Sequence, residues 1–209
     1  MENLTPTLKK NRLKIENAAM ELILAKGIEA TTISDISAKT AMQRRTVYNH
    51  FASKELIVKS LFDKTSKKII EALNVTHDYS QYENGFKRIK HLFKNYVSTI
   101  LTYKEEACFI VHYDYYYASK IDEHTLFDVL GKTRFDNVLE LFNEGIKDGS
   151  INLRGHDPLN VFMIMGVTLF DTVAKRLYQN AEKQSLTYEE QTFIHSLSEI
   201  LLEGIRNPC

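Results

Sequence analysis

Between positions 43 and 50 the chain reads QRRTVYNH, a short run rich in hydrogen-bond donors. Arginine can form a paired hydrogen bond with the edge of guanine, and glutamine can do the same with adenine. Threonine and tyrosine hydroxyls suit phosphate oxygens. If the run is helical, its first residues, Gln43, Arg44 and Arg45, would point at the bases of a major groove. The pattern therefore predicts a DNA recognition helix.

The flanking residues predict the elements that would position such a helix. Thr32 followed by Asp35 is typical of a capping box at the start of a preceding helix. Ser53 with Glu55 indicates the start of a following helix. An earlier apolar stripe at helical spacing predicts a first helix that ends at Gly27. Two short helices joined by a tight turn, behind a longer one, are a helix-turn-helix pattern.

Taken together, the residues from Thr31 to Leu56 resemble the DNA-binding domain of TetR-family transcriptional regulators. The matching elements are a TTI entry, the pair DI in the second helix, TVY in the recognition helix, Phe51, and the run SKE that opens the next helix. The resemblance implies that Thr32, Tyr48 and Lys54 contact the DNA backbone. The candidate DNA-binding residues are Thr32, Gln43, Arg44, Arg45, Thr46, Tyr48, Asn49, His50 and Lys54.

Two positions depart from the family pattern. Ala41 stands where the turn usually has glycine, so it must either avoid left-handed backbone angles or accept strain. Arg45 stands where a small residue is common, which affects the detailed base contacts. An arginine pair can also be a solvated charged face, and Tyr48 can be a half-buried packing residue.

The charge of the chain is unevenly distributed although its formal net charge is zero. Residues 1–54 contain nine Lys and Arg against five Asp and Glu, a net of +4, which leaves −4 for the remainder. This asymmetry indicates that only the N-terminal end meets phosphates. The basic residues Lys9, Lys10, Arg12 and Lys14 are either an arm beside the duplex or a polar terminus.

The rest of the chain has helical periodicity throughout. We expect helices at about 54–75, 82–102, 104–119, 123–147, 157–180 and 187–204, and we find no convincing strand. The predicted fold is all-α, with about nine helices. We expect a helix-turn-helix DNA-binding domain over residues 1–53 and a helical regulatory and dimerisation domain over residues 54–209.

The expected helix at 157–180 is apolar on nearly all sides, which requires burial on nearly all sides. A partner copy could cover one of those sides, because helix-turn-helix proteins usually read two half-sites as dimers. The alternative is a core helix of a monomer. The candidate interface residues come from this helix and the last one: Phe162, Gly166, Phe170, Phe193, Leu197 and Leu201.

An aromatic stretch, FIVHYDYYY, occupies residues 109–117. The family resemblance implies a cavity for a small-molecule inducer between the helices of the body. Aromatic walls with a few hydroxyls would suit a hydrophobic or aromatic ligand. An aromatic stripe can equally be ordinary core. The candidate lining residues are Phe93, Tyr96, Phe109, His112, Tyr113 and Tyr116.

Other classes of function find little support. The sequence has no glycine-rich phosphate loop or GxSxG motif, and its acidic and histidine residues lack the spacing of a helical-bundle metal site. We expect no catalytic residues, metal or cofactor. Two cysteines, Cys108 and Cys209, give no disulfide framework. We found no signal peptide or membrane-length apolar run, and we expect a cytoplasmic protein with no membrane partner.

The sequence thus predicts a homodimeric, sequence-specific DNA-binding transcriptional regulator that binds a palindromic operator. By resemblance it is a TetR-type repressor released by a small-molecule inducer. The alternative is a helical dimeric protein-interaction module that no longer uses its helix-turn-helix on DNA, which the zero net charge and the nonstandard turn would fit.

Overall fold

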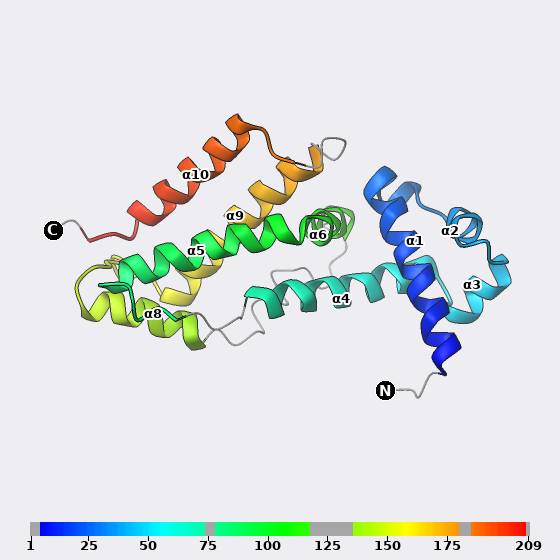
Figure 1. Cartoon of the computed structure of the whole chain (residues 1–209), viewed down its shortest axis with the longest axis horizontal. Coiled ribbons are helices and arrows are strands. Elements are labelled where there is room, and N and C mark those ends of the chain that lie inside the picture. The colour runs from blue at the N-terminus through cyan, green and yellow to red at the C-terminus, as the bar shows by residue number, and fades with distance from the viewer. Residues whose placement is uncertain (1–4, 74–77, 118–135, 180–184, 208–209) are drawn as a thin grey trace. The chain divides into compact units, whose positions relative to one another are not determined.

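The computed structural model describes residues 5–73, 78–117, 136–179 and 185–207. Within those segments the chain forms helices and no strand, and a single isolated bridge joins Ile151 to Arg206. The predicted all-α fold is therefore confirmed (Figure 1). The helices are α1 (Pro6–Ala30), α2 (Ile33–Thr40), α3 (Arg44–His50), α4 (Lys54–Leu73), α5 (Gly85–Thr102), α6 (Lys104–Tyr117), α8 (Asp136–Lys147), α9 (Pro158–Gln179) and α10 (Tyr188–Glu203).

The chain divides into two compact units. In the described residues the first unit contains 5–68 and 108–117, and the second contains 69–73, 78–107, 136–179 and 185–207. The first unit thus joins the helix-turn-helix to most of α4 and to most of α6. The functional boundary expected after residue 53 stays a prediction.

The first unit is built on the apolar face of α1. Ile15, Ala19 and Ile23 are buried on that face, and α2 and α3 pack against the same helix. Gly27 has a φ of 84°, so regular helical geometry stops there, as predicted, and a short helical turn continues to Ala30. A buried carboxylate, Glu16, accepts a hydrogen bond from Ser60 Oγ at 2.7 Å and pairs with Lys64, which ties α1 to α4.

Most of the helix starts follow the predicted caps. Capping boxes open α2 and α10, where Thr32 and Thr187 each accept a bond from the backbone amide three residues on. The Ser53 hydroxyl accepts from the Leu56 amide at 3.3 Å. Asp157 accepts from the Asn160 amide at 3.0 Å and α9 begins at Pro158. These caps satisfy amides that have no partner inside the helix.

Two expected boundaries shift, and several others lie outside the described residues. The helix expected from 82 begins at Gly85, because Asn84 caps it by accepting from the Lys87 amide at 2.9 Å. The last helix ends at Glu203, one residue before the expected end. The expected start at 123 and ends at 75, 119 and 180 cannot be compared, and Cys209 also lies outside the described residues.

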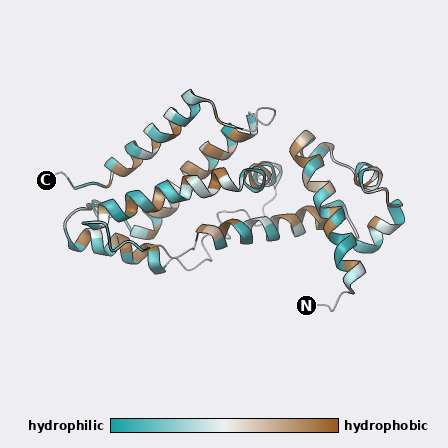
Figure 2. Ribbon diagram, viewed as in Figure 1, coloured by the Kyte–Doolittle hydropathy of each residue, from teal (hydrophilic) through white to brown (hydrophobic). Residues whose placement is uncertain are grey.

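The second unit packs α9 against α5, α8 and α10. The start of α5 lies so close to α8 that a Cβ built on Gly85 would be 2.2 Å from the Gly145 Cα. Asp148 accepts the Gly85 amide at 2.7 Å and Ser150 accepts the Phe86 amide at 3.0 Å, so the segment after α8 caps α5. Figure 2 shows alternating brown and teal positions along these helices, as burial on one side requires.

Among the described residues, α9 is the helix whose length and composition would allow it to cross a membrane. Nine of its residues are buried inside this unit, including Phe162, Leu169 and Val173. A core helix can have the same composition as a membrane span, and the packing of α9 against α5, α8 and α10 favours a core helix.

Candidate nucleic-acid interface

The turn before α3 is a Schellman motif without its usual glycine. The Met42 amide donates to the Ser37 carbonyl at 3.1 Å, and the Ala41 amide donates to the Ala38 carbonyl at 3.2 Å. This pair of bonds requires a left-handed residue after the helix, normally glycine. Ala41 adopts φ 53° and ψ 31°, so the chain accepts left-handed angles at a residue with a Cβ. Of the two alternatives that the sequence left open, the structure takes the strained one.

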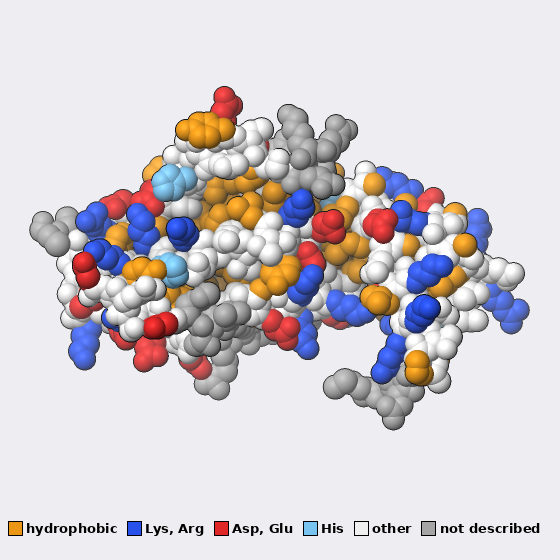
Figure 3. Space-filling view, in the orientation of Figure 1, with side chains coloured by type: hydrophobic (Ala, Val, Ile, Leu, Met, Phe, Trp, Pro, Cys, Tyr) orange, Lys and Arg blue, Asp and Glu red, His pale blue; other side chains and the backbone are white. Residues whose placement is uncertain are grey.

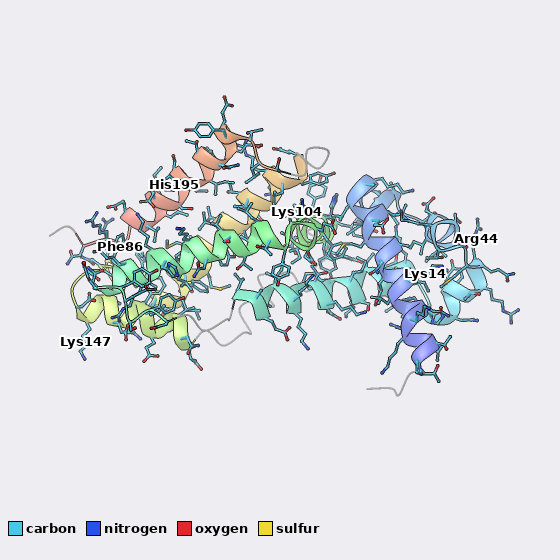
Figure 4. All side chains as sticks on the ribbon, viewed as in Figure 1. Lys14, Arg44, Phe86, Lys104, Lys147 and His195 are labelled. Carbon is cyan, nitrogen blue, oxygen red and sulfur yellow. The ribbon has the colours of Figure 1, made fainter. Side chains whose placement is uncertain are left out.

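The helix α3 is anchored on one side only. Val47 is fully buried and Phe51, which follows the helix, is 3% exposed. Gln43 precedes the helix and makes no capping bond with its side chain. Gln43, Arg44, Arg45, Tyr48 and Asn49 are all exposed. Figure 4 shows Arg44 on this helix, with its side chain extending away from the neighbouring helices of the unit.

Within the described residues, the side chains of this exposed face have no protein partner. The guanidinium groups of Arg44 and Arg45 and the amide of Gln43 therefore keep all their donors available. Tyr48 is 50% exposed, so its ring is partly packed and its hydroxyl is available. A helix that presents unpaired donors at its N-terminal end can make bidentate bonds to base edges.

Arg12 fixes the C-terminal end of α3. Its guanidinium donates to the His50 carbonyl at 2.7 Å and lies 3.9 Å from the centroid of the Phe51 ring. The bond satisfies a carbonyl that has no partner within the helix. From sequence, Arg12 was expected either in a basic arm beside the duplex or in a polar terminus. Its position three residues before Ile15, on the buried face of α1, was the available signal for an inward role.

Two of the predicted phosphate contacts have internal partners. Lys54 Nζ donates to the carbonyls of Ile28 at 2.9 Å and Glu29 at 3.3 Å, at the end of α1. The Thr32 hydroxyl both accepts from the Asp35 amide and donates to the Asp35 carboxylate. These side chains hold helix ends together. Lysine has three donors, so Lys54 keeps one for a phosphate, whereas the hydroxyl hydrogen of Thr32 is used.

Thr46, His50 and Lys54 are partly buried, and this leaves six exposed residues among the nine predicted DNA-binding residues. The carboxylate of Asp35 also accepts from Lys26 Nζ at 2.8 Å. The bond from Lys26, followed by the bonds from Thr32, lowers the pKa of Asp35 from 3.8 to about 2. The capping box is therefore fully formed at neutral pH.

Some basic residues of the first unit are paired with acidic side chains and others are unpaired. Lys26 pairs with Asp35, and Lys39 pairs with Glu21 at 2.7 Å. In the described residues the lysines and arginines of α1 to α3 that remain unpaired and exposed are Lys9, Lys10, Lys14, Arg44 and Arg45. Figure 3 shows blue side chains at several places on this unit. The free positive charge is thus concentrated on the first turns of α1 and the start of α3.

The six candidate ligand residues fall into two separate units. Phe109 and Tyr113 are 0% and 1% exposed, and Tyr113 stacks on Phe62 with ring centroids 3.9 Å apart, so both belong to the core of the first unit. In that unit Tyr116 lies 5.9 Å from Lys54 Nζ, and partial burial lowers the pKa of His112.

The other two candidate ligand residues, Phe93 and Tyr96, belong to the second unit. Tyr96 donates to the Gly166 carbonyl at 3.0 Å, and burial raises the pKa of Tyr96. Phe93 packs against Phe162, with ring centroids 6.0 Å apart. These contacts give both residues packing roles within the unit. A ligand cavity formed by the set of six stays a prediction.

The candidate dimer residues all lie in the second unit and divide into a buried and an exposed set. Phe162, Gly166 and Phe170 are buried inside the second unit, because their stripe on α9 faces α5 and is not available to a partner. The side of α9 that the unit leaves open carries Ile164, which is 64% exposed. On α10, Phe193 is 48% exposed, and Leu197 and Leu201 are partly exposed on the same stripe. The predicted residues of α10 thus lie on an exposed stripe and those of α9 on a buried one, and the dimer interface itself stays a prediction.

The comparisons with known proteins point to one class. A family model described as bacterial regulatory proteins, tetR family, matches residues 15–61. The HTH-type transcriptional regulator TcmR of Streptomyces glaucescens is 34% identical over 68 residues, which are 32% of this chain. That alignment covers 30% of the relative, so the similarity in sequence does not extend over most of either protein.

The similarity in fold extends much further. The crystal structure of a bacterial regulatory protein in the tetR family from Rhodococcus RHA1 has a TM-score of 0.69 at 19% identity, over 95% of this chain and 98% of that chain. The MbdR regulator from Azoarcus sp. CIB has a TM-score of 0.64 at 18% identity, over 92% and 97% of the two chains. Identities this low show a common fold alone.

The fold and the exposed face of α3 define a helix-turn-helix protein with a helical body. Residues 15–61 match the tetR family of bacterial regulatory proteins, and the fold of the chain is similar to that of solved tetR-family structures. The matching family model describes regulatory proteins, in agreement with the expectation that the chain is not an enzyme.

Proposed function

We propose that this protein is a sequence-specific DNA-binding transcriptional regulator that inserts α3 into the major groove of an operator. The observation that carries the proposal is the exposed face of α3, where Gln43, Arg44 and Arg45 have unpaired donors while Val47 holds the opposite face in the core. Base edges are read by such donors, and a paired bond from arginine to guanine is the commonest specific contact.

The backbone contacts in this proposal differ from the predicted set. The unpaired cations available to phosphates are Lys9, Lys10 and Lys14 of α1. The hydroxyl of Tyr48 is a further, neutral donor. Lys54 holds the end of α1 with two bonds and offers its third donor to a phosphate. Thr32 acts through the cap of α2, and its backbone amide is used by Asp35.

The proposed functional form is a homodimer. Two recognition helices must lie roughly 34–36 Å apart to read successive half-sites of a palindromic operator. We assign the pairing surface to the open side of α9 and the outer stripe of α10, with Ile164, Phe193 and Ile200 at its centre. Phe193 and Ile200 are seven residues apart on one side of α10 and are 48% and 70% exposed, and exposed apolar side chains that share a face favour an interaction surface.

The dimer is tested by analytical ultracentrifugation of Ile200→Asp combined with Phe193→Asp. We expect the variant to sediment as a monomer and to lose most of its operator affinity. Ile146→Asp is the matched control, because Ile146 is 44% exposed on α8 and lies outside the proposed surface. A dimer that survives the double substitution would place the interface elsewhere.

We further propose that the protein acts in the cytoplasm as a repressor and that a small molecule releases it from DNA. A ligand can shift the protein away from the DNA-bound state only by its difference in affinity for the two states. The similarity of residues 15–61 to the tetR family supports this mode of control. The measurement is operator affinity in a gel shift with and without candidate metabolites, and a repressor loses affinity when the inducer is added.

DNA binding is tested by gel shift on fragments flanking the gene, at several salt concentrations. Arg44→Ala combined with Arg45→Ala should lower specific affinity roughly tenfold or more, since each good base contact contributes about 1–3 kcal/mol. The matched control is Lys67→Ala combined with Lys68→Ala, which removes the same charge from an exposed pair on α4. Salt-dependent affinity without sequence preference, or an equal loss in both variants, would favour a helical interaction module.

A further inference from the structure

The second unit contains a large open groove between α5 and α10 that DNA recognition does not use. Its volume is about 1170 Å³. The floor is apolar and consists of Phe93, Val97, Leu101, Leu177, Ile194 and Leu202. Figure 3 shows the orange floor exposed between α10 and α5. Ordinary small-molecule sites have volumes of roughly 300–1,000 Å³ and mostly apolar walls, so the groove is large enough for a small ligand.

The rim of the groove is strongly basic. Lys87, Lys90, Lys94 and Lys104 line it, and Glu199 is the one acidic residue among the described lining residues. The formal charge of the lining is therefore +3 with the two histidines, His91 and His195, neutral. Residues 55–209 carry a net negative charge, whereas the lining of this groove carries a net positive charge. Such a concentration attracts anionic ligands.

One lysine remains available for a ligand. Lys87 pairs with Glu83, and Lys90 pairs with Glu199 across the groove at 2.6 Å. Lys94 is exposed and has no partner within the described residues. Its ammonium group can therefore bind an anion without first breaking an ion pair. A lysine–carboxylate hydrogen bond is strengthened by the charges on both groups.

Along α5 the lining of the groove is first basic and then apolar, and Lys104 at the start of α6 lies beyond the apolar part. Lys87, Lys90, Lys94, Val97 and Leu101 follow one another every three or four residues and share one side of α5. This stripe changes from basic to apolar at Val97. From Lys94 to Leu101 the helix rises about 10 Å, which is the length available for an apolar tail beyond the charged residue. Figure 4 labels His195 on α10 and Lys104 at the start of α6, both lining residues.

We propose that this groove binds an amphipathic carboxylate, with its anionic head at Lys94 and its hydrocarbon chain over Val97 and Leu101. Burial of the chain on the apolar floor supplies affinity, and the lysines select the charged head. A neutral molecule with the same chain loses the head contact. This site differs from the inducer cavity expected from the sequence. Of the six residues predicted to line that cavity, only Phe93 lines the groove.

The test measures binding to the full chain without DNA. The probe is cis-parinaric acid, a fluorescent fatty acid. The assay measures its displacement from the protein by dodecanoate or by dodecanol, each kept below the concentration at which it aggregates. We expect Lys94→Glu to weaken dodecanoate binding about fivefold or more and to leave dodecanol binding unchanged, since one charge contact is reversed in a partly exposed site. Lys147→Glu, at an exposed lysine of α8 in the same unit, should bind both competitors like the parent.

A second pair of variants tests the apolar floor. Leu101→Asp should weaken both competitors, whereas Ile146→Asp should weaken neither, although these two side chains are similarly exposed at 38% and 44%. The proposal is overturned if dodecanoate fails to displace the probe, or if Lys94→Glu and Lys147→Glu lose affinity equally. It is also overturned if Leu101→Asp leaves displacement intact and reduces the oligomer, because a second copy would then occupy the groove. Since no DNA is present, these outcomes are independent of operator binding.

Discussion

Ala41 is the position where a single substitution should make the protein more stable. Its left-handed backbone angles, φ 53° and ψ 31°, bring the Cβ of an L-residue close to the following carbonyl, which costs roughly 1–2 kcal/mol. Ala41→Gly removes that strain. Glycine also gives the unfolded chain more freedom, which opposes the gain by about 0.4–1 kcal/mol. We therefore expect a net stabilisation of about 0.5–1 kcal/mol.

The matched control is Ala38→Gly, three residues earlier and inside α2. Ala38 is exposed and helical, so glycine there costs about 0.8–1.0 kcal/mol without removing any strain. The two variants should thus change stability in opposite directions and differ by about 1.3–2 kcal/mol. Because the substitutions are chemically identical, their difference isolates the backbone conformation.

Native-state hydrogen exchange measures the effect within the first unit. The amides of Thr40 and Val47 lie on either side of the turn, and their exchange should slow in Ala41→Gly and accelerate in Ala38→Gly. Urea denaturation followed by circular dichroism gives the same comparison for the whole chain. If Ala41→Gly is no more stable than the parent, the turn carries no strain and the reasoning fails.

Three further predictions follow from the contacts around the two units. Arg12→Ala should destabilise the first unit by about 1–2 kcal/mol in urea denaturation. The substitution removes a hydrogen bond to the His50 carbonyl and a cation–ring contact with Phe51. Arg12→Lys should rescue only part of that loss. The folded-state pKa of Asp35 lies below its ordinary value of 3.8, so the unfolded state binds more protons in acid. The contribution of Asp35 to the free energy of unfolding is therefore complete above about pH 4 and is lost as the pH falls toward about 2. Exchange of the α2 amides should accelerate over that interval in the parent, and Asp35→Asn should remove this dependence. Gly85→Ala should destabilise the second unit by about 3 kcal/mol or more in thermal denaturation, because its Cβ would lie 2.2 Å from the Gly145 Cα, and an unchanged melting temperature would contradict that close crossing.

Local sequence determined the elements of this protein because their signals act within one helical turn. The capping boxes at Thr32 and Thr187, the cap at Ser53 and the Asp157–Pro158 start are all present in the structure. A cap depends on a side chain and an amide three residues apart, and tertiary packing does not alter that spacing. The same local chemistry put Gln43, Arg44 and Arg45 at the exposed start of α3.

The partners of long side chains were beyond a local reading. Lys54 reaches carbonyls 25 and 26 residues earlier, and Arg12 reaches a carbonyl 38 residues later. Sequence indicated that both were basic and near the predicted DNA surface. Whether each cation faces phosphate or a helix end depends on the crossing of α1 with the later helices.

The orientation of α9 was likewise decided by the tertiary structure. The helix is apolar on several sides, so composition required burial but did not specify which stripe would meet the chain's own core. Tyr96 and Phe93 of α5 fill the side that holds Gly166 and Phe162, and Ile164 is left exposed. The sequence by itself therefore determined the helices, their caps and the recognition segment, because these depend on neighbours one turn away. Only the tertiary structure decided which faces are buried and which cations remain free, because those choices depend on residues far apart in the chain.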